Sequence, residues 1–159
     1  MRNCTLPIHV AAERGAGAFP VAVFALLVGL VGGCSSFEQS WRQMAEAPPV
    51  NDEVLGRWEG RWASEATGHG DVLRCIITKQ ADGAYDAWFR ARFMKVFNGE
   101  YHAALEATRH GDHWRLSAAA DLGFLAGGVY RQEGQIRDGL YSTTYQSKHD
   151  RGRLEMRRQ

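Results

Sequence analysis

Residues 56–64 have the sequence GRWEGRWAS, in which large aromatic and very small residues alternate with charged ones. Successive side chains of a β-strand point to opposite faces. Trp58, Trp62 and both glycines therefore share one face, and the arginines and the glutamate share the other. Alternation of very large and very small inward residues suits the tapering interior of a small β-barrel. The stretch predicts the first strand of such a barrel, with both tryptophans pointing inward.

Turn residues divide the chain after this strand into seven further segments of alternating pattern. The turns lie at 67–71, 82–83, 98–99, 111–112, 123–128, 138–139 and 150–152. The predicted strands are about 55–64, 72–80, 84–96, 101–110, 113–122, 129–137, 140–148 and 153–158. Short connections pair consecutive strands antiparallel. Because no helix is predicted in this part of the chain, closure is the direct way to cover the apolar face. We therefore predict an all-β domain, an eight-stranded antiparallel up-and-down barrel.

Two of these turns determine the register of the strands that they join. Two-residue turns at 111–112 and 138–139 decide which residues lie opposite each other. The predicted pairs are His110 with His113, Ala107 with Leu116, Leu105 with Ala118, Glu106 with Ser117, Ile136 with Tyr141, Gly134 with Thr143 and Gln132 with Tyr145.

The turn at Asn98-Gly99 is predicted to be longer. A two-residue loop there would place Phe93 opposite Ala104 and mix the two faces of the sheet, because a slip of one residue reverses every side chain. Adding Glu100 to the loop places Phe93 opposite Leu105 and keeps the apolar residues inward. We therefore predict a three-residue or bulged loop at 98–100.

Gly56-Arg57-Trp58, at the start of the first strand of such a barrel, resembles the Gly-x-Trp signature of lipocalins and related calycin barrels. In that family the tryptophan packs across one barrel end against an arginine from near the last strand. The resemblance implies this role for Trp58, and for Arg151, Arg153 or Arg157 as its partner. The chain is also similar to small uncharacterised bacterial lipoproteins, a likeness that implies no particular activity.

Residues 19–34, FPVAVFALLVGLVGGC, form an apolar run preceded by Arg2 and Arg14. About 15 apolar residues span roughly 22 Å as a helix, less than the ~30 Å hydrocarbon core of a bilayer. A basic flank and a short apolar run are typical of a secretory signal peptide.

Val31-Gly32-Gly33-Cys34 resembles the lipobox of bacterial lipoproteins. The resemblance implies that residues 1–33 are removed and that Cys34 is acylated, for example with palmitate, and anchors the protein to a membrane. An ordinary signal peptide with an incidental cysteine and an uncleaved anchor are the alternatives.

Residues 34–54 are predicted to form a linker between the lipid and the barrel domain at 55–159. Ser35 and Glu38 have the spacing of a capping box, and Phe37, Trp41 and Met44 follow at helical intervals. This pattern predicts a short amphipathic helix that ends before Pro48-Pro49. Its apolar stripe can lie on the bilayer or pack on the barrel, and the sequence leaves both open.

The residue after the cysteine bears on the cellular location. Among lipoproteins, an aspartate at this position tends to hold a protein at the inner membrane, and here the residue is Ser35. The resemblance therefore implies a bacterial cell-envelope protein at the outer membrane, facing the periplasm.

Charge and cysteine content exclude several classes of protein. Removing 1–33 takes away Arg2, Arg14 and Glu13, which leaves 17 basic and 17 acidic residues. A near-neutral chain without a basic stripe does not indicate a nucleic-acid partner.

Once Cys4 is removed and Cys34 acylated, Cys75 has no cysteine partner. It lies in an apolar run and is predicted to be a buried, inert thiol.

Candidate catalytic and metal-binding patterns are weak. His110 and His113, paired across a tight turn, lack a third ligand, so we predict no metal site. No Ser/His/Asp order or pair of carboxylates indicates a catalytic centre, and no motif indicates a cofactor. We predict that the protein is not an enzyme.

The predicted interior is rich in aromatic residues, several of which have hydroxyl groups. The inward set is Trp58, Trp62, Tyr85, Phe89, Phe93, Tyr101, Leu105, Trp114, Tyr130, Tyr141, Tyr145 and Met156. An eight-stranded barrel is either just filled by side chains or holds one small ligand. Buried hydroxyls need hydrogen-bond partners, which a ligand or water molecules would supply.

Two hypotheses of function follow from this interior. In the first, the barrel binds a small apolar or amphipathic molecule. Its candidate contacts are Trp58, Trp62, Tyr130, Tyr141 and Tyr145 inside the barrel and His69 in a glycine-rich loop at the rim. In the second, the barrel is filled, and the protein has a structural or protein-interaction role through outward Trp88 and Met94.

The lipobox gives a direct test of anchoring. Cys34→Ala should leave an unprocessed or soluble species that takes up no labelled palmitate, because the acylated atom is gone. Metabolic palmitate labelling followed by membrane fractionation measures both effects. Equal labelling and equal membrane retention of the variant and the wild type would exclude the lipoprotein hypothesis.

Overall fold

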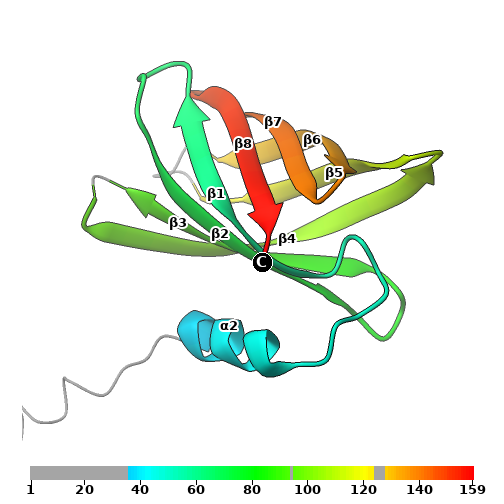
Figure 1. Ribbon diagram of the computed structural model, residues 1–159. Helices are drawn as coiled ribbons and strands as arrows, with labels where there is room; N and C mark the ends of the chain where they lie inside the picture. Colours follow the sequence, from blue (N-terminus) through cyan, green and yellow to red (C-terminus); the bar gives the residue numbers. More distant parts are fainter. Residues whose placement is uncertain (1–35, 94, 124–127) are drawn as a thin grey trace, which may run out of the picture. The chain divides into compact units, whose positions relative to one another are not determined.

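The computed structural model describes residues 36–93, 95–123 and 128–159. In it, eight antiparallel strands pair in sequence order and close into a barrel (Figure 1). The strands are β1 (Gly56–Ser64), β2 (Gly70–Lys79), β3 (Tyr85–Phe93), β4 (Phe97–His110), β5 (His113–Asp121), β6 (Val129–Arg137), β7 (Leu140–Gln146) and β8 (Arg151–Arg158). The predicted all-β up-and-down barrel is confirmed. The predicted lipobox and Cys34 lie outside the described residues.

The barrel has two different ends. At one end, which we call the mouth, lie the β1–β2, β3–β4, β5–β6 and β7–β8 connections. At the other end, which we call the base, lie the remaining three hairpin turns and residues 52–55, which lead into β1.

The register of two hairpins agrees with the sequence pattern. Across β4 and β5, His110 pairs with His113 and Leu105 with Ala118. Across β6 and β7, Ile136 pairs with Tyr141. The predicted registers around 111–112 and 138–139 are confirmed.

The β3–β4 connection differs from the prediction. Phe93 pairs with Phe97, so the loop consists of residues 94–96, and Asn98 and Gly99 lie within β4. The predicted loop at 98–100 and the pairing of Phe93 with Leu105 are therefore wrong. The two faces stay as predicted, because the register differs by an even number of residues.

The reason for the displaced loop is a contact made by a distant strand. Lys95 has a positive φ of 65°, which is uncommon for a residue other than glycine. Its backbone N–H donates to Asp71 Oδ2 of β2 at 3.1 Å. This tertiary hydrogen bond fixes the turn at Lys95, and the local preference of Asn-Gly for turns does not decide its position.

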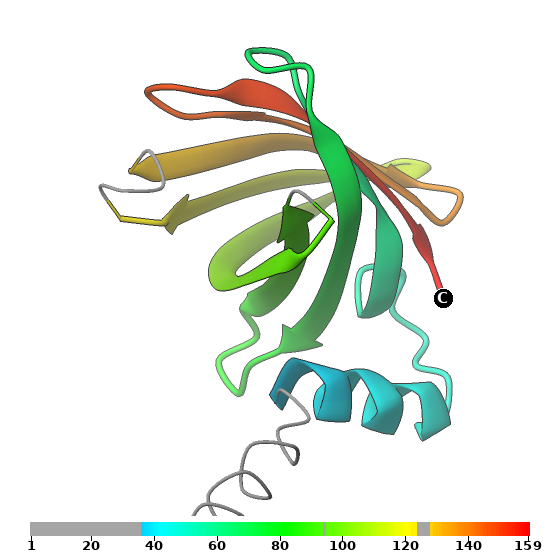
Figure 2. The ribbon, with the colours of Figure 1, turned by 90° about the vertical axis from the view of Figure 1, so that its left-hand side faces the viewer.

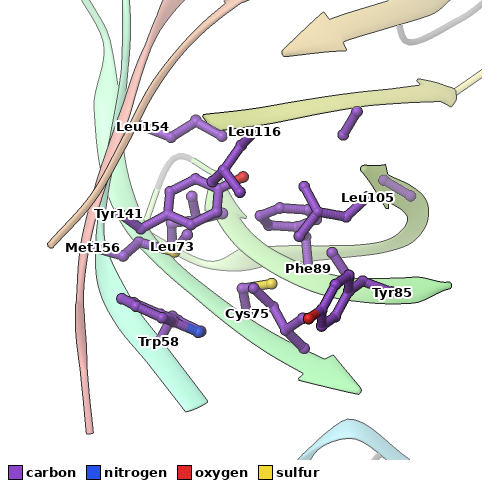
Figure 3. Packing of buried hydrophobic residues seen from close by; sticks show 14 of the residues in the cluster. Trp58, Leu73, Cys75, Tyr85, Phe89, Leu105, Leu116, Tyr141, Leu154 and Met156 are labelled. Atoms are coloured by element: carbon purple, nitrogen blue, oxygen red, sulfur yellow. The ribbon is translucent and has the colours of Figure 1, made fainter. Parts of the chain in front are cut away.

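The base half of the interior is filled by side chains. Trp58, Phe89 and Tyr141 are fully buried, and the Trp58 and Tyr141 rings lie 6.0 Å apart (Figure 3). Cys75 lies in the same cluster as a free, buried thiol, and burial raises its pKa. The prediction of a buried Cys75 is confirmed.

Residues 52–55 close the base. Val54 is fully buried, and its carbonyl accepts a hydrogen bond from Trp58 Nε1 at 3.1 Å. Asp52 accepts one from the Tyr85 hydroxyl at 3.0 Å. Glu53 accepts one from Trp114 Nε1 at 2.9 Å. The segment leading into β1 is therefore part of the packed barrel.

The arginine opposite Trp58 in the last strand is Arg158. Its guanidinium lies beside Gly56, where a Cβ atom would be 3.4 Å from Nε. The predicted candidates alternate with the buried residues of β8, and they are exposed, as Arg158 is: Arg151, Arg153 and Arg157. None of these three takes the position beside Trp58.

Helix α2 (Ser36–Glu46) packs on the outer wall of the barrel, which settles the question left open by the sequence (Figure 2). Phe37 and Trp41 are buried against Ile76 of β2. Phe37 also meets Trp88 of β3 edge-on, with ring centroids 5.1 Å apart. The outward Trp88 is therefore partly covered by the protein's own helix. Among the described residues, no helix has the length and apolarity needed to cross a membrane.

Charged contacts fix the position of α2. Glu38 Oε1 accepts hydrogen bonds from Arg74 at 3.3 Å and from Arg90 at 2.8 Å. The guanidinium groups of Arg57 and Arg74 lie 5.0 Å and 5.2 Å from the centroid of the Trp41 ring. Cation–π contacts of this kind add to the apolar packing.

Two glycines allow the main chains of β1 and β8 to approach closely. A Cβ atom on Gly60 would lie 1.9 Å from the carbonyl oxygen of Glu155. One on Gly152 would lie 1.9 Å from the carbonyl oxygen of Ala63. The space beside Gly60 is therefore occupied by the β8 main chain and not by a tryptophan ring.

The first strand gives a test of this packing. Trp58→Ala should lower the free energy of unfolding by about 3–5 kcal/mol, as large aromatic truncations in cores do. Gly60→Ala should cost about 1–3 kcal/mol or more, because its methyl group meets main chain that cannot move aside. Arg61→Ala, on the exposed face of the same strand, is the control and should stay within about 0.5 kcal/mol. Urea unfolding measures all three; a larger loss from Arg61→Ala would mean that the strand is inside out.

Candidate functional site

The mouth half of the interior contains a pocket of about 210 Å³. Its walls are mostly aromatic and aliphatic side chains from the inward faces of the strands, together with two polar residues. The lining residues are Trp62, Leu73, Ala91, Phe93, Tyr101, Leu122, Tyr130, Gln132, Tyr145, Asp150 and Leu154. We call this space the mouth pocket.

Two pairs of aromatic rings stand in the wall of the mouth pocket. Trp62 of β1 and Phe93 of β3 have centroids 5.2 Å apart, and Tyr130 of β6 and Tyr145 of β7 have centroids 5.8 Å apart. Strands β3 and β7 are four strands apart in either direction round the closed barrel. The two ring pairs therefore belong to opposite sides of the pocket.

Trp62 is held in position by its indole nitrogen. Nε1 donates to the backbone carbonyl of Arg92 at 3.0 Å, so its polar atom is satisfied and the rest of the ring remains as apolar surface. The Trp62 ring is half-buried, in contrast to Trp58 on the same strand.

Asp150, at the end of the β7–β8 loop, is the acidic group of the pocket. Its Oδ1 accepts a hydrogen bond from Ser64 Oγ at 2.6 Å, and its Oδ2 accepts one from the Tyr145 hydroxyl at 2.9 Å. The backbone N–H of Asp150 donates to Ser147 Oγ at 3.0 Å. Burial, followed by the hydrogen bond to Asp150, raises the pKa of Tyr145. The carboxylate is therefore fixed in place by neutral hydroxyl groups.

Gln132 lies at the inner end of the pocket and joins two tyrosines. Its Nε2 donates to the Tyr101 hydroxyl at 3.4 Å, and its Oε1 accepts from the Tyr141 hydroxyl at 3.2 Å. Burial raises the pKa of both phenols, so they remain neutral at physiological pH. This chain of hydrogen bonds marks the boundary between the mouth pocket and the filled base.

Asp71 organises the rim next to Phe93. Asp71 as a whole residue is 6% exposed, and its carboxylate accepts hydrogen bonds from Arg92 Nε at 2.9 Å, Val72 N at 2.8 Å and Lys95 N at 3.1 Å. The hydrogen bond from Arg92, the two backbone donors and the nearby positive charge lower the pKa of Asp71 to about 2. The ionised carboxylate thus ties β2 to the β3–β4 loop.

The structure brings together three of the six predicted contact residues. Trp62, Tyr130 and Tyr145 line the mouth pocket. Trp58 and Tyr141 are fully buried in the base half and do not line it. His69 is exposed in the β1–β2 loop, and its carbonyl accepts a hydrogen bond from Ser64 N at 2.8 Å.

The sequence did not single out Asp150 as a site residue. It lies in Asp-Arg-Gly, a typical turn sequence, and only its distance from Ser64 in the folded chain shows its position. The sequence feature that could have pointed to Asp150 was Ser64, a polar residue on the inward face at the end of the first strand.

The paired histidines lie at the base, away from the mouth pocket. The rings of His110 and His113 are 6.1 Å apart, and His113 Nδ1 lies 3.1 Å from Asp112. Within the described part of the chain, no group of three His, Cys, Asp or Glu side chains is placed to hold a metal ion.

Strand order and pocket define the protein as a closed eight-stranded antiparallel barrel with an aromatic pocket at one end. No protein-family model, no curated protein and no solved structure matches the chain. The fold class therefore comes from the strand topology alone.

The Asp71 contact gives a test through pH. Because the folded-state pKa of about 2 lies below the ~3.9 of an unfolded aspartate, ionised Asp71 stabilises the fold above about pH 4. This stabilisation is lost as the pH falls toward 2. Asp71→Asn should be less stable than the wild type near neutral pH, and the difference should shrink over that window. Urea midpoints measured at several pH values give the difference.

Arg92→Gln is the matched partner variant for this test. It should cost stability over the same pH range, and the double variant should add little to either single change. A difference between Asp71→Asn and the wild type that stays constant down to pH 2 would contradict the assignment.

Proposed function

We propose that the protein is a lipid-anchored, lipocalin-like barrel of the bacterial cell envelope that binds a small apolar or amphipathic molecule in its mouth pocket. The observation behind the proposal is the pocket itself, an aromatic hollow above a filled base. Ligand sites are typically concave and mostly apolar, with a few placed polar groups. The mouth pocket has this composition, with Asp150 and Gln132 as its polar groups.

The size of the pocket limits the ligand. At about 210 Å³, it is larger than a ~150 Å³ cavity that takes benzene. It is smaller than the roughly 300–1,000 Å³ of sites for drug-sized molecules. The ligand class that fits is a molecule of one or two rings, or the end of an alkyl chain.

The lipocalin likeness is supported at the base. Trp58, the tryptophan of the Gly56-Arg57-Trp58 motif, is fully buried across that end and pairs in register with Arg158 of the last strand. An arginine of the last strand beside this tryptophan is what the family resemblance implies.

The anchor is proposed from the lipobox and from the position of α2. Cys34 precedes the first residue of α2 by two positions, which is at most about 7 Å of extended chain. With Cys34 acylated, the docked helix would hold the barrel close to the bilayer, at the outer membrane on the periplasmic side.

A structural or protein-interaction lipoprotein is the alternative function, and the filled base half favours it. The two functions differ in one respect: a structural barrel has no need of an accessible mouth pocket.

Native mass spectrometry and titration separate these functions. The full chain, extracted from membranes in a neutral detergent, should carry a small co-purifying molecule or take up indole in a titration. Ala91→Leu should abolish both, because Ala91 is 5% exposed and lines the pocket. Ala119→Leu, at an exposed position of β5, is the matched control and should bind as the wild type does. Absence of a bound molecule and of indole binding in the wild type, or equal binding by Ala91→Leu, would favour the structural role.

A further inference from the structure

The mouth pocket has a single formal charge, and it is negative. Of its lining residues, all of which belong to the described part of the chain, Asp150 alone is charged at neutral pH. The others are aromatic, aliphatic or amide side chains. An anion would meet this carboxylate without a compensating positive group in the pocket wall.

Two of the basic residues near the mouth have other acidic partners. Arg92 Nη2 pairs with Asp71 at 2.8 Å. Arg151, next to Asp150 in the chain, pairs with Glu65 at 3.2 Å. Both side-chain hydrogen bonds of Asp150 come instead from neutral hydroxyls. A carboxylate has about four acceptor positions, so Asp150 can accept further donors.

The local structure does not require the charge of Asp150. Its two hydrogen bonds join the β7–β8 loop to Ser64 of β1 and to Tyr145 of β7. An asparagine of the same shape has an oxygen acceptor and an amide that can bond to hydroxyls. A partly buried carboxylate is costly to desolvate unless a positive group pairs with it. The pocket thus contains a charge that its own wall does not neutralise.

The rings around this charge suit a cation. The faces of tryptophan, tyrosine and phenylalanine attract ammonium groups, most strongly when water is excluded. Tyr145 brings the two features together, because its ring pairs with Tyr130 and its hydroxyl donates to Asp150. Trp62 and Phe93 supply a second pair of rings on the other side of the pocket.

We propose that the ligand of the mouth pocket is a small organic cation, an amine or quaternary ammonium with an apolar body. Its positive head lies beside the Asp150 carboxylate, and its body lies between the Trp62–Phe93 and Tyr130–Tyr145 ring pairs. This inference rests on the proposed function and names the chemical class of ligand for that site.

Three ligands with the same apolar body and different heads provide the test. They are 2-phenylethylamine, a cation at neutral pH, 2-phenylethanol, which is neutral, and phenylacetate, an anion. Each is titrated calorimetrically into the full chain in neutral detergent, with a blank titration into detergent alone. The amine should bind at least about tenfold more tightly than the alcohol, and phenylacetate should bind more weakly than the alcohol.

Variants of two mouth aspartates assign the preference to one carboxylate. Asp150→Asn should weaken amine binding to the level of the alcohol and leave alcohol binding within about twofold. Asp121→Asn is the matched control, because Asp121 ends β5 at the mouth and does not line the pocket. It should keep the preference for the amine.

The possible outcomes separate the two proposals. Alcohol binding that equals or exceeds amine binding, tightest binding of phenylacetate, or an amine preference that survives in Asp150→Asn would overturn the cation proposal and leave a binding barrel. Failure of all three compounds to bind the wild type would overturn the proposed function as well. If Asp150→Asn does not fold, the three wild-type affinities still decide whether the pocket prefers a cation.

Discussion

The close approach of the β1 and β8 main chains at Gly60 and Gly152 is the constraint on which the rest of the barrel depends. At each position, a side-chain carbon would overlap a carbonyl oxygen of the neighbouring strand. With glycine there, the last strand pairs with the first along Trp58 to Ser64, and the sheet has no open edge. Closure creates the enclosed space in which one half can be packed and the other can remain hollow.

The base half of that space is filled and the mouth half is hollow because the large side chains are placed differently in the two halves. Trp58, Phe89 and Tyr141 are fully buried in the base half and fill it together with the other core side chains. At the mouth, rings such as Trp62 and Phe93 pack against each other in the wall, and the small side chain of Ala91 adds little volume. The hydrogen-bonded Gln132 lies at the boundary. A rigid base beneath a polar-edged hollow is a suitable scaffold for a small binding site.

Alternation along single strands made the barrel, its faces and two of its hairpin registers predictable, because a period of two is a local property of the chain. Features set by distant residues were not. The β3–β4 loop lies where Asp71 meets Lys95, 24 residues later. Trp58 and Trp62 have the same pattern in sequence, and their different depths depend on which end of the barrel each approaches. Asp150 looks like an ordinary turn residue until Ser64 and Tyr145 are seen to donate to it.

The docking of α2 also affects how such a protein would be retained by a membrane. The apolar stripe that an amphipathic helix usually inserts into the interface is buried here on Ile76 and Trp88. Acyl chains on Cys34 would then be the main source of attachment, at about 0.8 kcal/mol for each buried methylene group. The number and length of those chains would set the residence time. A barrel that lost them would leave the bilayer with its helix still folded against the wall, as one water-exposed particle.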